Sequence, residues 1–206
     1  DGQISLFAIT ETNSFEALAL AYGEEDIYYI STGREISSSY LLEKMKAADV
    51  KTWIAMDLKS QLKLMEYGKD FDYVNQWDSY AADRSRYFDV TIGAYLLNPL
   101  KGDYPHDDIA KDHLGLMVPT EKDLKEDNCK LACYKAYIAW KAKSVMEKAL
   151  EEQGMSQLFY EVEMPLAFVL YDMEREGICM DVAALKEYSK ELEGSIVELE
   201  KKIHEA

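Results

Sequence analysis

The hydrophobic and polar positions in the first part of the chain follow the pattern of β-strands joined by short polar turns. Apolar runs cover residues 4–10, 17–22 and 27–30, and a polar turn at 23–26 separates the last two runs. Short apolar runs bounded by turn residues indicate strands. We therefore expect three consecutive antiparallel strands at the start of the chain.

The pattern then alternates between helix and strand. Residues 38–48 carry apolar positions at helical spacing, residues 52–56 form a buried strand, and residues 58–67 return to helical spacing. Residues 69–87 have no clear period, so we interpret them as a loop or insertion with at most one short strand. A strand–helix step of this kind predicts an α/β domain with a mixed sheet.

Helical spacing dominates the remainder of the chain. Asp89 can cap the first of these helices, Gly115 closes the second, Gly154 ends the third, and Pro165 is expected to kink or restart the fourth. Gly177 suits a left-handed C-terminal cap, and Asp181 can cap the last helix. The predicted helices cover residues 88–97, 106–114, 128–151, 157–175 and 182 to the end of the chain, with a charged loop at 121–127.

Apolar stripes on the long helices predict which faces are buried. The last of them forms a seam that needs a partner helix. The three stripes consist of Leu131, Tyr134 and Ile138; of Leu166, Val169, Leu170 and Met173; and of Leu185, Leu192 and Leu199.

Composition narrows the class of protein. The 206 residues are 48% hydrophobic, which is enough for one sizeable core with a small appendage. No apolar run is long enough to span a membrane. The formal net charge of −16 disfavours tight tracking of DNA phosphates. The chain starts at Asp1 with neither Met nor a charged leader, so we expect a piece of a longer protein.

The cysteines indicate a reducing compartment, which places the protein in the cytoplasm. Cys129, Cys133 and Cys179 are an odd number of thiols and form no disulfide framework. Cys129 and Cys133 share one helix face, and no histidine is near them in the sequence. We therefore predict buried thiols rather than a metal site.

The candidate chemistry begins at the end of the first strand, where Glu11 follows the apolar run. Strand ends are where α/β domains usually place their active sites. A metal-dependent nuclease needs several carboxylates there, because two divalent ions require several oxygen ligands. The position two before Glu11 is Ile9, which ligates nothing.

Two stretches of the chain resemble bacterial DNA polymerase I (family A). The first runs from Phe88 to Pro99 and resembles the F-D-x-x-x-x-x-Y-(L/V)-L-(N/D)-P segment of the 3′–5′ exonuclease domain. The second, more specific stretch runs from Glu163 to Asp181 and resembles the passage between that domain and the polymerase thumb. With the order of the strands, the resemblance covers essentially the whole chain.

The resemblance implies a ribonuclease H-like exonuclease fold over residues 1–152, followed at 153–206 by helices that lead to a truncated thumb. In this family, four acids bind two metal ions. Here Ile9 replaces the first acid and Glu11 is retained. Asp57 replaces the motif's Asn, Gln61 replaces the third acid, and Lys135 replaces the fourth.

A single retained ligand cannot hold two divalent ions about 4 Å apart. We therefore expect an inactive site with no catalytic residue, no metal and no cofactor in this part of the chain. The resemblance implies a parent DNA-directed DNA polymerase that uses Mg²⁺. DNA would be bound through that parent, and the remaining polymerase domain would be joined in cis, with no membrane partner. The role of the present chain would be to support the polymerase or orient the duplex.

Two alternatives remain open at this stage. In the first, Glu11 and Asp57 share a metal with help from Glu16 and form a rebuilt exonuclease site, although Asp57 also suits a helix N-cap. In the inactive site expected above, by contrast, Lys135 would pair with Glu11 or point to solvent. In the second alternative the chain is a protein-interaction module, with Trp77 and Tyr80 as exposed candidates, whereas Trp53 and Trp140 belong to the core.

Overall fold

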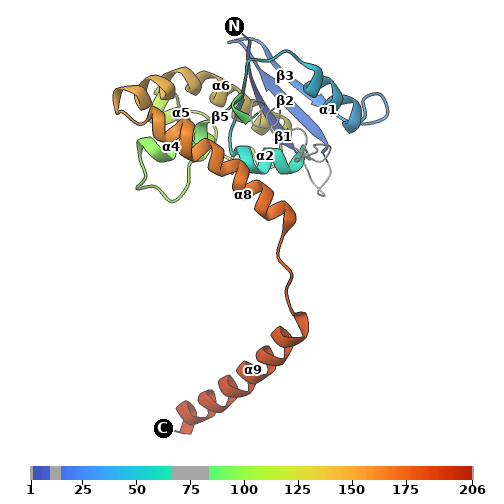
Figure 1. Ribbon diagram of the computed structural model, residues 1–206, viewed down its shortest axis with the longest axis vertical. Helices are drawn as coiled ribbons and strands as arrows, with labels where there is room; N and C mark the ends of the chain where they lie inside the picture. Colours follow the sequence, from blue (N-terminus) through green and yellow to red (C-terminus); the bar gives the residue numbers. More distant parts are fainter. Residues whose placement is uncertain (1, 10–14, 66–83, 206) are drawn as a thin grey trace. The chain divides into compact units, whose positions relative to one another are not determined.

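The computed structural model describes residues 2–9, 15–65 and 84–205, and the side chains of residues 8 and 9 are outside this description (Figure 1). The chain divides into two units, Asp1–Arg175 and Glu176–Ala206. Glu11, Trp77 and Tyr80 lie outside the described residues.

A mixed five-stranded sheet forms the centre of the first unit. The strands are β1 (Gln3–Ile9), β2 (Ala17–Ala21), β3 (Ile27–Ser31), β4 (Thr52–Ala55) and β5 (Tyr87–Asp89), and their order in the sheet is β3-β2-β1-β4-β5. The first three pair antiparallel, as predicted. β4 and β5 are parallel to β1 and extend the sheet on its other side. The predicted α/β fold with a mixed sheet is confirmed.

Helices complete the first unit, and α6 packs along β1 and β2 (Figure 1). The helices are α1 (Ser38–Ala47), α2 (Leu58–Leu64), α4 (Val90–Leu97), α5 (His106–Leu114), α6 (Asn128–Glu152), α7 (Ser156–Leu158), the π-helix η1 (Phe159–Glu163) and α8 (Met164–Glu176). The buried residues of α6 include a row of small ones, Ala132, Ala136, Ala139 and Ala142, which lets the helix approach the sheet closely. Of the predicted stripe only Ile138 is buried, whereas Leu131 and Tyr134 are half-buried.

β5 corrects the predicted start of the following helix. Phe88 belongs to a strand rather than to the helix, because Ile54 of β4 pairs with it across the sheet. Its ring is fully buried and lies 4.7 Å from the ring of Phe159, centroid to centroid. Asp89 caps α4 as predicted, accepting a hydrogen bond from the backbone N–H of Thr91.

An irregular helical segment precedes Pro165, where a kink or restart was predicted. Phe159–Glu163 is π-helical and α8 begins at Met164. Proline has no N–H to donate to the preceding turn, so a regular α-helix through this point would lack one hydrogen bond. The prediction of an irregularity is confirmed.

The prediction for the buried side of α8 is wrong. Leu166, Val169, Leu170 and Met173 are exposed, and the face that contacts the core consists of Met164, Ala167, Phe168 and Tyr171. Both sets repeat at the same helical spacing. The periodicity of the sequence therefore could not distinguish them.

The second unit contains α9 (Val182–Glu205). Gly177 has a φ of 71°, as expected for a left-handed C-terminal cap, and residues 178–180 have no regular secondary structure. Asp181 caps α9, and its Oδ1 accepts hydrogen bonds at 3.0 Å from the backbone N–H groups of Ala183 and Ala184. No described residue of α9 is buried within its own unit. None of the described helices is both long enough and apolar enough to cross a membrane.

Candidate functional site

A pocket of about 670 Å³ opens beside the carboxyl ends of the parallel strands. Its walls come from α2, from the loop at 102–106 and from the first two turns of α6, with Phe7 of β1 also in contact. β1, β4 and β5 run parallel, so their carboxyl ends lie at one edge of the sheet. This is the usual location of a functional site in an α/β domain.

The pocket brings together three of the five positions that the sequence singled out. Asp57, Gln61 and Lys135 all line it, although the first two belong to the strand–helix step and the third to α6. Ile9 is the last residue of β1, and nothing is described of its side chain. Glu11 lies beyond the described residues.

Asp57 is the N-cap of α2, as predicted. Its Oδ2 accepts a hydrogen bond of 2.6 Å from the Ser60 hydroxyl, and its Oδ1 lies 3.5 Å from the backbone nitrogen of Ser60. Asp57 also has a left-handed backbone with φ of 56°, and its N–H donates to Thr91 Oγ1 at 3.0 Å. The carboxylate therefore caps the N-terminus of α2 and is not free to bind a metal.

Gln61 occupies the second turn of α2 and only 2% of it is exposed. A neutral amide at this depth carries no charge to offset a divalent cation, and hard cations favour carboxylates. The position therefore does not supply the negative charge that the resemblance assigns to it.

Lys135 is held in an ion pair. Its Nζ lies 2.5 Å from Oε1 of Glu121 and 4.8 Å from the centroid of the Phe7 ring, and 17% of the side chain is exposed. The interpretation of Lys135 as a solvent-facing residue is therefore wrong. The hydrogen bond from Lys135 holds the pKa of Glu121 below its usual value.

Glu121 is a site residue that the sequence did not identify. It belongs to the charged run at 121–127, which has the composition of a solvated loop. The structure places Glu121 in the lining of the pocket, together with residues of α2. No local pattern distinguishes Glu121 from the neighbouring acids, so only the tertiary fold reveals the pair.

Asp89 is the last residue of β5 and is almost fully buried. Its Oδ2 accepts a hydrogen bond of 2.8 Å from the N–H of Leu58, the first residue of α2, and its Oδ1 accepts one of 2.8 Å from Thr91. Burial raises the pKa of Asp89 to about 6, and the backbone hydrogen bonds oppose that rise. One carboxylate thus caps two helices.

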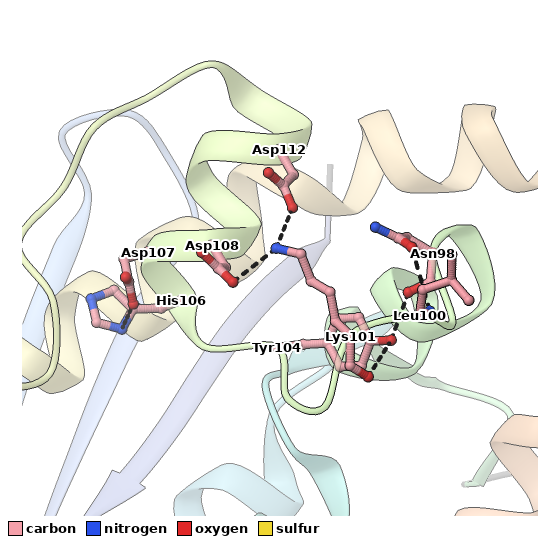
Figure 2. A network of polar contacts seen from close by, with 8 residues as sticks. All are labelled: Asn98, Leu100, Lys101, Tyr104, His106, Asp107, Asp108 and Asp112. Atoms are coloured by element: carbon pink, nitrogen blue, oxygen red, sulfur yellow. Dashed lines mark hydrogen bonds and ion pairs between the residues drawn. The ribbon is translucent and has the colours of Figure 1, made fainter.

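A polar network fixes the wall of the pocket at the start of α5 (Figure 2). Nζ of Lys101 donates to Oδ2 of Asp108 at 2.8 Å and to Oδ2 of Asp112 at 2.6 Å. The Tyr104 hydroxyl donates to the carbonyl of Asn98 at 2.6 Å. These contacts hold the loop at 98–105 against α5, so the pocket has a defined wall.

His106 is fully buried at the first turn of α5. Its Nε2 lies 2.9 Å from the carbonyl oxygen of Pro119. A carbonyl only accepts, so Nε2 carries the proton in this contact. Burial lowers the pKa of His106, which favours the neutral ring. The residue joins α5 to the loop that carries Glu121.

Three of the described pocket residues, Asp57, Gln61 and Glu121, do not supply the free carboxylates that a two-metal nuclease site needs. Asp57 caps a helix, Gln61 is neutral, and Glu121 is paired with the ammonium of Lys135. Over residues 2–9, 15–65 and 84–205, no three acidic, cysteine or histidine side chains lie together in a group that could hold a metal.

The cysteines differ from the prediction of buried thiols. Cys129 and Cys179 are exposed, Cys133 is half-buried, and all three are free. Burial raises the pKa of the Cys133 thiol to about 11, and the nearby Cys129 adds to this rise. Cys129 lies in the first turn of α6.

The chain is similar in fold to part of a DNA polymerase, and its relatives in sequence are bacterial DNA polymerase I proteins. The protein of Bacillus subtilis (strain 168) is 28% identical over 198 residues, which cover 89% of this chain and 22% of that protein. The protein of Borreliella burgdorferi is 25% identical over 208 residues, which cover 88% of this chain and 21% of that protein. The protein of Streptococcus pneumoniae serotype 4 is 36% identical over 85 residues, which cover 41% of this chain and 9% of that protein. The expected resemblance is confirmed.

A solved structure agrees in fold. The POL domain of Pol1 from M. smegmatis, in complex with DNA primer-template and dNTP, matches 95% of this chain with a TM-score of 0.67 and 17% identity. The match covers 32% of that chain. The present chain spans about a fifth of the length of the first curated relatives. No protein-family model matches it.

Proposed function

We propose that the chain is part of a DNA-directed DNA polymerase, and that residues 1–152 form an exonuclease-like domain of ribonuclease H-like type that does not hydrolyse DNA. Residues 153–206 lead toward the polymerase thumb. DNA is bound through the parent polymerase, whose polymerase part is joined in cis and uses Mg²⁺. The domain supports that part and helps to orient the duplex.

The ion pair of Lys135 and Glu121 is the observation that carries this proposal. The pair lies in the pocket that Asp57 and Gln61 also line, and the resemblance assigns the positions of Gln61 and Lys135 to metal-binding acids. An ammonium group repels a divalent cation, and Glu121 balances the ammonium rather than a metal. The charge of Lys135 is thus balanced by a protein group.

The net charge agrees with a domain that supports the polymerase part rather than one that binds DNA by itself. At −16 the chain repels the phosphate backbone overall, so it is a poor independent DNA-binding module. Within a longer polymerase the domain need not hold DNA itself. The similarity to bacterial DNA polymerase I over 89% of the chain supports this setting.

A nuclease assay tests the proposal. The 206-residue chain is incubated with single-stranded DNA and either Mg²⁺ or Mn²⁺, and the expected result is no cleavage above a metal-free control. Metal-dependent cleavage that is lost in Glu11→Ala and kept in Glu35→Ala, an exposed acid before α1, would overturn the proposal. It would favour instead an exonuclease rebuilt around Glu11 and Asp57.

A second test uses the longer polymerase. Deleting residues 1–152 is expected to lower its thermal stability or its affinity for primer-template DNA and to leave its error rate unchanged. An increase in the error rate would show that the domain proofreads, and would contradict the proposed role.

A further inference from the structure

Two thiols lie together at the start of α6. Cys129 is in the first turn of the helix, and Cys133 follows it by four residues. Residues at this spacing are neighbours on a helix surface, with Cβ atoms about 5–6 Å apart. Neither thiol is in a disulfide, so both sulfurs are available as ligands.

The two side chains interact with each other. Burial is the main cause of the raised pKa of Cys133, and Cys129 adds to it through charge repulsion and a side-chain hydrogen bond. The carboxylate of Asp127 adds further negative charge nearby. A cation held between the two sulfurs would remove the repulsion between the thiolates, because it attracts both of them.

The pair has one open side and one apolar side. Cys129 is exposed to solvent, so an incoming ion can reach it directly. Cys133 is half-buried and packs against a cluster of small residues from β2 and α6, namely Ala19, Ala21, Ala132 and Ala136. An apolar shell of this kind limits the access of water to a metal–thiolate bond.

The spacing of the two thiols favours a bridging ion over a disulfide. A disulfide needs Cβ atoms about 3.5–4.5 Å apart, which is closer than neighbouring turns of an α-helix bring them. Two metal–thiolate bonds of about 2.3 Å each allow the sulfurs to lie up to about 4.6 Å apart. A thiophilic ion can therefore join the two residues without unwinding α6, which packs along β1 and β2.

The number and type of the ligands select the kind of ion. In the part of the chain that the structure describes, no further acidic, cysteine or histidine side chain joins the two thiols to form a group of three. Zn²⁺ takes four ligands in its structural sites, and Mg²⁺ and Ca²⁺ prefer oxygen. Cu⁺ is a soft ion that prefers thiolates, and two of them suffice for it.

We propose that Cys129 and Cys133 form a two-thiolate binding site for a soft monovalent metal ion, with Cu⁺ as the expected occupant. On binding, the two thiols release two protons and form two Cu–S bonds, and neither copper nor sulfur changes its oxidation state. The ion spans the first two turns of α6, which also place Asn128 and Leu131 in the wall of the pocket. It therefore stabilises this part of the wall.

Titration with Cu⁺ tests the proposal. The 206-residue chain is titrated without oxygen, in competition with the coloured Cu⁺ chelator bathocuproine disulfonate, and one ion is expected to bind per chain. Cys129→Ser and Cys133→Ser are each expected to weaken binding by about tenfold or more, because the second thiolate binds within the same chain at high effective concentration. Cys179→Ser removes the exposed thiol that follows α8 and should leave the affinity unchanged.

Three outcomes of the titration would overturn the proposal. Unchanged affinity in Cys133→Ser would show that one exposed thiol binds the ion by itself. A ratio of one ion to two chains would indicate a bridge between copies rather than a site within one helix. Weaker binding in Cys179→Ser would show that the ion uses a thiol outside α6.

Alkylation of the thiols by iodoacetamide gives a second readout, in which mass spectrometry measures the rate at each cysteine. Cu⁺ is expected to slow the alkylation of Cys129 by about tenfold or more, since only the free thiolate reacts, and to leave the rate at Cys179 unchanged. Equal slowing at both thiols, or at neither, would contradict the site. Circular dichroism of Cys129→Ser checks that the fold is intact, as expected for a substitution at an exposed position.

Discussion

The carboxylate of Asp89 accepts a hydrogen bond of 2.8 Å from the backbone N–H of Leu58, which lies 31 residues earlier in the chain. The same carboxylate caps its own helix through Thr91. Two helices thus begin at one buried charge, and both begin next to the carboxyl ends of β4 and β5. The helix dipoles and the N–H groups stabilise the ionised carboxylate against the cost of burial.

Replacing Asp89 with Asn is expected to destabilise the fold by about 1–3 kcal/mol, the usual cost of leaving a buried polar group unsatisfied. The amide has only one oxygen to accept a hydrogen bond, so one of the two helix termini loses its partner. Urea unfolding at pH 7.5 measures the change. Asp103→Asn, at an exposed position, is the control, and an equal effect in both variants would contradict the double cap.

The pH dependence of stability follows from the same residue. The pKa of Asp89 is raised from 3.8 to about 6, so the folded state binds its proton more tightly than the unfolded state. Protonation of Asp89 therefore adds stability as the pH falls through 6, and this contribution is lost as the pH rises again.

The contribution is isolated by comparing two proteins at two pH values. Between pH 7.5 and pH 5, the stability of the unaltered chain relative to Asp89→Asn should increase by about 1 kcal/mol. The comparison removes the acids whose pKa is lowered, such as Glu121, which act in the opposite direction. A constant difference across this range would be inconsistent with the raised pKa.

The pair of Lys135 and Glu121 should show a measurable coupling. Because Lys135 is largely covered while Glu121 is half exposed, we expect a coupling free energy of about 0.5–1 kcal/mol from Lys135→Ala, Glu121→Gln and the double variant. The exposed helix pair Lys202 and Glu198 is the control, with less coupling. Additive effects of the two substitutions would argue against a functional pair in the pocket.

Two glycines within helices offer a contrast in packing. A Cβ at Gly194 of α9 would meet nothing within 4 Å, so Gly194→Ala should increase the helicity of α9 by removing about 1 kcal/mol of unfavourable propensity. A Cβ at Gly93 of α4 would lie 3.3 Å from Sδ of Met146. Gly93→Ala should therefore bring no net gain, because crowding offsets propensity. Circular dichroism and urea unfolding distinguish the two cases.

Much of the fold could be predicted because its signals are local. The strands at 17–22 and 27–30 are apolar runs next to turn residues. The caps at Asp57, Asp89 and Asp181 are side chains that accept from backbone N–H groups within three residues. β5 could not be predicted in the same way. It is three residues long, and it is a strand only because β4 lies beside it.

In the candidate site, too, some residues could be predicted from local sequence and others could not. Asp57 and Gln61 follow a strand in the sequence, so their place at the edge of the sheet could be expected. The partner of Lys135 could not, since Glu121 precedes it by 14 positions in a loop with no period of its own. The face of α8 was also undecidable, because its two apolar stripes have equal spacing and only the packing of Phe168 on Tyr87 selects one.

The π-helical segment at Phe159–Glu163 also affects which apolar stripe of α8 is buried. A helix turns by about 100° with each residue, so the number of residues between α7 and α8 sets the direction in which each side chain of α8 points. The two stripes lie two residues apart. A chain shortened by two residues in this segment would therefore turn Leu166 toward the sheet and Phe168 toward solvent. The length of this segment and the packing of Phe168 on Tyr87 therefore agree on which surface the protein presents.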